Sequence, residues 1–90
     1  MVKSIHTDEN GVFRTLLIEK RKAAGLTQQE LANRLGKPQS FVSKFEKGER
    51  RLDVLEYLSV MRALGADACA FLKRIEESAK SQKHLARRRR

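Results

Sequence analysis

Four polar side chains lie close together in one short segment: Gln39, Ser40, Ser43 and Lys44. If the segment is helical, spacings of one, three and four residues place them on one side of the helix. A glutamine amide can pair bidentately with adenine, a lysine can donate to guanine O6 and N7, and a serine hydroxyl can bond to a base or a phosphate. No acid precedes Glu46 in this segment. These residue types therefore indicate a surface that reads base edges in the major groove of duplex DNA.

Cations surround the polar segment. Residues 37–51 hold five basic and two acidic residues, a local balance of +3. Lysine and arginine beside a base-reading face bind backbone phosphates, which position a protein without reading sequence. An ordinary solvated helix face is the alternative explanation, but the acid-free start and the flanking charges favour nucleic acid. The candidate phosphate ligands of this stretch are Lys37, Lys47, Arg50 and Arg51.

Capping signals and apolar periodicity predict five helices. Thr27-x-x-Glu30 and Asp53-x-x-Glu56 are capping boxes, in which the first side chain accepts from a backbone N–H three residues on and the glutamate carboxylate reaches back. Gly36 ends the second helix, since glycine tolerates the left-handed conformation of a helix C-terminus. The expected helices cover about 10–24, 28–35, 39–47, 54–64 and the residues from 68 onward.

The second and third helices are each about two turns long, and about three residues centred on Gly36 connect them. So short a connection makes the two axes cross steeply, as in a helix-turn-helix unit. Pro38 has no N–H to donate and therefore suits the start of the third helix. The apolar edge of that helix is expected to face inward, which leaves its polar side in solvent.

The length and the pattern allow one domain. At 90 residues the chain has room for a single small core, and five helices without a strand pattern predict a compact all-α bundle over residues 10–79. Residues 1–9 are expected to form a loose arm. The net charge is +9, and residues 80–90 form a basic tail with six basic groups and no acid, which leaves +3 for residues 1–79. Such a balance suits a polyanion.

Other function classes find no support in the sequence. A single cysteine, Cys69, excludes an intramolecular disulfide and is expected to be a small buried or interfacial residue. No apolar run is long enough for a membrane span or a signal peptide, so a cytoplasmic protein is expected. His6 and His84 have no carboxylate or cysteine at ligand spacing, and neither a metal nor another cofactor is expected. No catalytic constellation is present, so an enzyme is not expected.

A set of spaced residues within 17–72 matches one known family. The matching residues are Arg21, Gly25-Leu26-Thr27-Gln28, Glu30-Leu31-Ala32, Leu35-Gly36, Ser40, Val42-Ser43, Phe45-Glu46, Gly48 and Leu64-Gly65. In these positions the chain resembles the Cro and phage-repressor type (XRE-like) helix-turn-helix family. The resemblance implies a lambda-repressor-like domain that binds double-stranded DNA. Pro38 departs from the Ser or Thr cap that relatives often have, and Leu52 from the proline that many have before the fourth helix.

The resemblance also implies roles for particular residues. Relatives contact bases or nearby phosphates from the positions of the four polar residues named first. The glutamine at the position of Gln28 typically contacts a phosphate through its side chain or through the N-terminus of its helix, where the dipole favours an anion. Arg21 and Glu46 stand at the positions of an ion pair that ties the first helix to the third, and they are expected to belong to the scaffold.

The combined expectation is a DNA-binding transcriptional regulator, a repressor that occupies its operator. Relatives commonly dimerise on paired half-sites, so a homodimer is expected through the last helix, which carries Phe71, Leu72 and Ile75. One alternative is an antitoxin that represses its own operon and holds a toxin on another surface. A second is an adaptor that binds protein through the helical domain and RNA through the tail. Residues 87–90 are either a solubilising end or a phosphate-binding arm.

Overall fold

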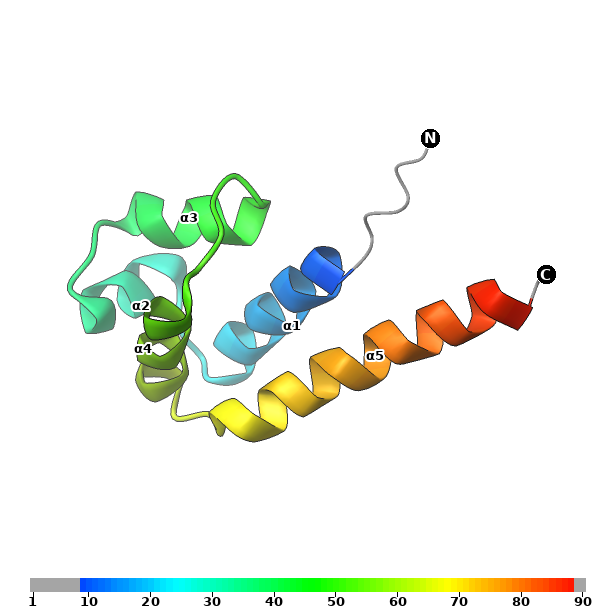
Figure 1. Cartoon of the computed structure of the whole chain (residues 1–90). Coiled ribbons are helices and arrows are strands. Elements are labelled where there is room, and N and C mark those ends of the chain that lie inside the picture. The colour runs from blue at the N-terminus through cyan, green and yellow to red at the C-terminus, as the bar shows by residue number, and fades with distance from the viewer. Residues whose placement is uncertain (1–8, 89–90) are drawn as a thin grey trace.

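Five α-helices and no strand make up residues 9–88, the part of the backbone that the computed structural model describes, with side chains described for residues 9–78 (Figure 1). The helices are α1 (Glu9–Ala23), α2 (Gln28–Leu35), α3 (Gln39–Lys47), α4 (Val54–Leu64) and α5 (Ala68–Arg88). The predicted all-α fold is confirmed. The expected arm falls almost wholly on residues 1–8, which lie outside the described residues, as do Arg89 and Arg90. The backbone of α5 continues through most of the basic tail.

Local hydrogen bonds set the helix starts where the sequence predicts them. Thr27 Oγ1 accepts from the Glu30 backbone N–H at 3.0 Å, and the Thr27 N–H donates to the Glu30 carboxylate at 2.9 Å. Asp53 and Glu56 form the same reciprocal pair at the start of α4, at 2.8 and 2.9 Å. The helix α3 begins after Pro38 without a side-chain cap. Its start therefore depends on packing against neighbouring helices.

The core gathers one side of each helix. The helix α1 packs against α3 and α5, and α2 packs against α3 and α4. Three aromatic rings, Phe13, Tyr57 and Phe71, meet with centroids 6.0 to 6.1 Å apart and join α1, α4 and α5. The largest fully buried side chains are Leu17, Leu31, Val42, Phe45, Val60 and Met61.

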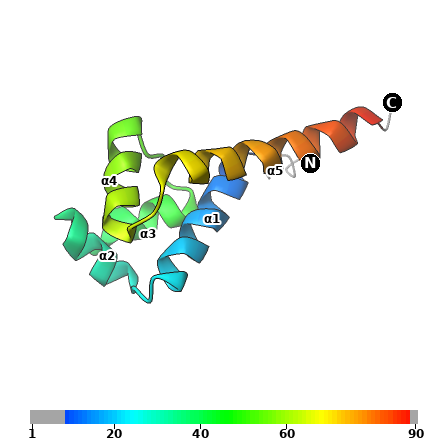
Figure 2. The same ribbon diagram turned by 90° about the horizontal axis from the view of Figure 1, so that it is seen from below.

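Helix α5 lies alongside α1 and then extends beyond the rest of the molecule, as two perpendicular views show (Figures 1 and 2). Leu72 on this helix is 51 % exposed, although it belongs to the apolar stripe of the sequence. Val54, the first residue of α4, is 71 % exposed. Both exposures have one reason: the apolar periodicity of a helix does not predict how far its neighbouring helices extend. Cys69 is also exposed, so the expectation that it is buried is wrong, and the alternative that it lies at an interface stays a prediction.

Candidate nucleic-acid interface

The helix α3 has one buried side and one side in solvent. Val42 is fully buried and Phe45 is 2 % exposed, which anchors the helix in the core. Gln39, Ser40 and Lys44 are exposed, and the fourth candidate base reader, Ser43, is half-buried. The structure therefore brings the predicted polar residues together on one short helix that the core holds from behind.

A chain of hydrogen bonds fixes the first of these side chains. Gln39 Nε2 donates to Gln28 Oε1 at 2.7 Å, and Gln28 Nε2 donates in turn to Glu46 Oε1 at 2.8 Å. Gln28 is the first residue of α2, so its side chain connects the starts of α2 and α3 to a buried carboxylate. Both amides are thereby oriented, and the second N–H of each amide is left for an external acceptor.

Arg21 and Glu46 form a bidentate ion pair at the base of this chain. Arg21 Nε donates to Glu46 Oε2 at 2.7 Å and Nη2 donates to Oε1 at 3.0 Å. Arg21 Nη1 also donates to the Leu26 carbonyl at 2.9 Å, which ties the α1–α2 connection to the same guanidinium. The exposed fractions are 9 % for Arg21 and 6 % for Glu46. The pair therefore lies in the protein interior and joins α1 to α3, as the resemblance implies for a scaffold pair.

The predicted phosphate ligands divide into two groups. Lys47 and Arg51 are exposed, and each has an unobstructed route to an external anion. Lys37 and Arg50 instead flank the half-buried ring of Phe41, with the Lys37 ammonium 5.4 Å and the Arg50 guanidinium carbon 4.7 Å from the ring centroid. These cation–π contacts place both charges between α3 and α4.

Arg50 already forms an ion pair with a carboxylate of the same chain. Its Nη1 and Nη2 donate to Glu56 Oε1 and Oε2 at 2.9 and 2.8 Å, and Nη1 also donates to the Arg51 carbonyl. These bonds, together with the backbone N–H of Asp53, lower the pKa of Glu56 to about 2. The same hydrogen bonds raise the pKa of Arg50. The pair therefore stays ionised at neutral pH and closes the α3–α4 connection.

One residue of this region escapes sequence reasoning. Arg14 on α1 donates from Nη1 to the Glu46 carbonyl at 3.5 Å, near the C-terminal end of α3. A Cβ added to Gly48 would lie 3.0 Å from Arg14 Nε, so the guanidinium packs directly on this glycine. Residues 14 and 48 belong to different elements with no shared period, and no local pattern indicates that they meet. Arg14 thus supports the end of α3 that carries Lys47.

Two negative findings limit the chemistry of the described residues. Among them, no three or more His, Cys, Asp or Glu side chains gather in a cluster that could hold a metal ion. None of the helices in the same part of the chain combines the length and the apolar composition that crossing a membrane requires. The exposed polar groups of the candidate site are amides, hydroxyls and cations.

Comparisons with known proteins agree with this geometry. A family model described as helix-turn-helix matches residues 17–71. An uncharacterised HTH-type transcriptional regulator of Methanothermobacter thermautotrophicus is 41 % identical over 55 residues, which is 61 % of this chain and 80 % of that protein.

Solved structures show the same arrangement of helices. An XRE-family like protein from Pseudomonas syringae pv. tomato superposes with a TM-score of 0.77 at 51 % identity, covering 84 % of this chain and 93 % of that one. The clp gene regulator ClgR from Corynebacterium glutamicum gives a TM-score of 0.69 at 26 % identity, covering 78 % and 91 %. With its two short helices, its buried ion pair and its exposed polar helix, this chain belongs to the XRE-like helix-turn-helix family of DNA-binding transcriptional regulators.

Proposed function

We propose that this regulator recognises an operator through α3 and represses transcription by occupying it. The observation that carries the proposal is the solvent face of α3, where Gln39, Ser40 and Lys44 are exposed on a helix anchored by its opposite side. An anchored helix of this width fits the major groove of B-form DNA, whose base edges present donors and acceptors in a distinct pattern for each base pair.

The side chains of α3 are assigned different tasks. Gln39 pairs with an adenine, because the amide is held by Gln28 and keeps a donor and an acceptor lone pair toward solvent. Lys44 donates to a guanine. Ser40 and Ser43 bond to a base or to the neighbouring phosphate. Sequence preference therefore resides in this set, and it depends on the orientation that the α2 glutamine imposes.

Phosphate contacts are assigned to Gln28, Lys47 and Arg51. The N-terminus of α2 presents unpaired backbone N–H groups beside Gln28, which is the arrangement that favours an anion. Lys47 and Arg51 are exposed cations that follow the polar face of α3. Lys37 and Arg50, whose charged groups contact the aromatic ring between α3 and α4, are assigned to helix packing instead.

A homodimer on two half-sites completes the proposal. Phe13 and Ile75 line a groove between α1 and α5, and the exposed Leu72 stands beside it. An apolar projection beside an apolar groove is self-complementary, which is what an isologous two-fold contact requires.

Selection of bound duplexes from a random DNA library tests the function. The expected result is one enriched motif, repeated with two-fold symmetry about 10–10.5 base pairs centre to centre. Binding without any enriched duplex motif, combined with salt-sensitive binding to RNA hairpins, would contradict the repressor function and favour the alternative of an adaptor that binds RNA. Sedimentation that shows a monomer at high micromolar concentration, with and without the selected duplex, would contradict the dimer.

A further inference from the structure

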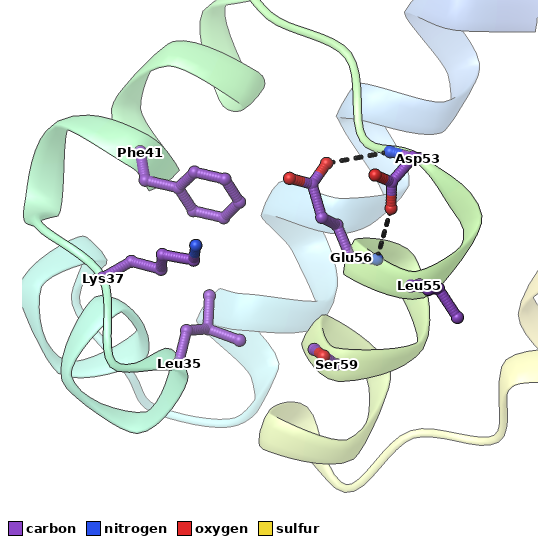
Figure 3. Close-up of a pocket in the computed structure, with 7 residues that line it drawn as sticks. All are labelled: Leu35, Lys37, Phe41, Asp53, Leu55, Glu56 and Ser59. Atoms are coloured by element: carbon purple, nitrogen blue, oxygen red, sulfur yellow. Dashed lines mark hydrogen bonds between the residues drawn. The ribbon is translucent and has the colours of Figure 1, made fainter.

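A second groove lies between the α2–α3 turn and α4, apart from the groove of the proposed dimer. Leu35, Lys37 and Phe41 form one wall, and Leu55, Glu56 and Ser59 of α4 belong to the other (Figure 3). The groove is open to solvent along one side. Its walls come from three different helices and the turn that joins two of them, so a partner that fits it would recognise the assembled fold.

The N-terminal turn of α4 exposes large apolar side chains at the edge of this groove. Leu55 is 73 % exposed and Val54 is 71 % exposed, more than any other large apolar residue of the described side chains. Leu55 lines the groove together with the half-buried Leu35 and Phe41, and Val54 precedes it at the same helix end. Apolar side chains gathered beside a concave site mark a place where another apolar surface is buried. An apolar protein surface fits these side chains better than a charged sugar–phosphate backbone does.

One of the two acids that line the groove is paired with a cation. Glu56 accepts two hydrogen bonds from Arg50 and one from the Asp53 backbone. Asp53 Oδ1 accepts from the Glu56 backbone as the α4 cap, which leaves the negative charge of Asp53 in place.

Cations outnumber acids around the groove. Lys37 contacts the Phe41 ring, and Arg34 donates to the Ala63 carbonyl at the C-terminal end of α4. Arg62 lies two turns after Leu55 on the same stripe of α4 and is exposed. Among the described side chains these three cations form no ion pair, although the charge of Lys37 helps to lower the pKa of Glu56. With Arg50 they make four cations against the two carboxylates of the groove, so its border carries an excess of positive charge.

We propose that this groove binds an acidic amphipathic segment of another protein, which buries apolar side chains against Leu35, Phe41 and Leu55 and pairs its carboxylates with the surrounding cations. Charge complementarity selects this occupant over a second copy of the chain. Two copies joined through this face would bring like charges together across a two-fold axis, which is unfavourable. The proposal does not depend on base reading by α3.

Selection from a phage-displayed library of random 16-residue peptides on the full chain tests the proposal. The expected peptides combine apolar residues at helical spacing with Asp or Glu. Leu55→Ser and Arg62→Glu are each expected to weaken the selected peptides at least tenfold. Arg74→Glu is the matched control for Arg62→Glu, because it reverses an exposed charge on α5, away from this groove, and is expected to leave peptide affinity unchanged. Leu55 and Arg62 are exposed, so both variants are expected to keep the far-ultraviolet circular dichroism and the duplex affinity of the parent.

Several results would overturn the proposal. They are basic selected peptides, an equal loss of peptide binding in Arg74→Glu, and a library that yields no enriched peptide. A shift of the sedimentation dimer constant in Leu55→Ser would show that a second copy, and not another protein, covers the groove. Because duplex affinity is measured on the same variants, failure of the groove proposal is distinguished from failure of DNA recognition.

Discussion

Replacement of Glu46 by alanine tests how the protein holds its recognition helix. The change removes the acceptor of two Arg21 hydrogen bonds and one Gln28 hydrogen bond while the guanidinium stays buried. Each of the two charge-assisted hydrogen bonds contributes about 1.5–3 kcal/mol to the free energy of unfolding. The expected loss is about 3–5 kcal/mol, the range for breaking one side of a buried ion pair. A small domain has only about 5–15 kcal/mol in total, so Glu46→Ala would be close to unfolding.

Urea denaturation followed by circular dichroism measures this loss. The double variant Arg21→Met/Glu46→Leu replaces both charges by apolar side chains of similar size, and such replacements of buried pairs are often neutral or better. Here the Leu26 carbonyl and the Gln28 amide lose a partner. The free energy of unfolding of the double variant is therefore expected to be about 1–2 kcal/mol lower than that of the parent. The destabilisation of the single variant is thus mostly the penalty of a buried unpaired guanidinium.

Duplex affinity of the double variant separates fold from function. The variant is expected to fold but to lose the hydrogen bond from Gln28 to Glu46, which holds the Gln28–Gln39 chain in place. One hydrogen bond contributes about 0.5–1.5 kcal/mol, so operator affinity is expected to fall by up to about tenfold. A loss below about 1 kcal/mol in Glu46→Ala, or a double variant as unstable as the single one, would refute the buried-pair reasoning. Unchanged operator affinity in the folded double variant would refute the role of the chain in recognition.

Two helix residues, two glycines that end helices, and the tail give further expectations. Lys44→Ala should lower operator affinity by about 1–3 kcal/mol and relax one base preference in a mobility-shift assay, and an equal loss on random duplex would contradict base reading. Glu56 has a pKa of about 2, below the ordinary 4.5, so its contribution to stability is complete above pH 4.5 and is lost as the pH falls toward 2. Urea midpoints should therefore show Glu56→Gln less stable than the parent at pH 6 and equal to it near pH 2; a constant difference would contradict the ion pair. Gly48→Ala should cost about 1–2 kcal/mol for its positive φ, and more than Gly36→Ala, because only at Gly48 does a guanidinium lie where the methyl would go. Equal urea midpoints for these two variants would contradict that packing. Deletion of residues 83–90 should weaken all duplexes alike and reduce the salt slope by about 0.9 per lost phosphate contact, whereas a changed motif would show that the tail reads bases.

Local signals predict the helices of this protein well. The capping boxes at Thr27 and Asp53 define helix starts through bonds between residues three apart, so the sequence contains both partners. The polar face of α3 is likewise a property of one helix and could be predicted from spacing alone. The Arg21–Glu46 pair joins residues 25 positions apart, and only the resemblance to a family implied it.

Contacts between elements explain what the sequence could not predict. Arg50 looks like a free cation in the sequence, but the α3–α4 connection turns it onto Glu56 and the ring of Phe41. Val54 and Leu55 look like ordinary helix residues, but within residues 9–78 no neighbouring side chains cover them at the start of α4. Both outcomes depend on where a neighbouring element begins or ends, which periodicity within one helix does not encode.

The recognition helix is too short to hold itself in place. A nine-residue helix such as α3 is not stable alone in water, and its start lacks a side-chain cap. Its position is set by two buried side chains on one side and by a polar chain that begins at Arg21 and ends at Gln39 on the other. In the proposed recognition mode Gln39 reads a base, and the chain fixes the rotamer of its amide before DNA arrives. Less side-chain freedom would then be lost on binding, and a wrong base could not be accommodated by simple reorientation. The proposal thus makes the stability of the fold and the selectivity for the operator depend on the same buried carboxylate.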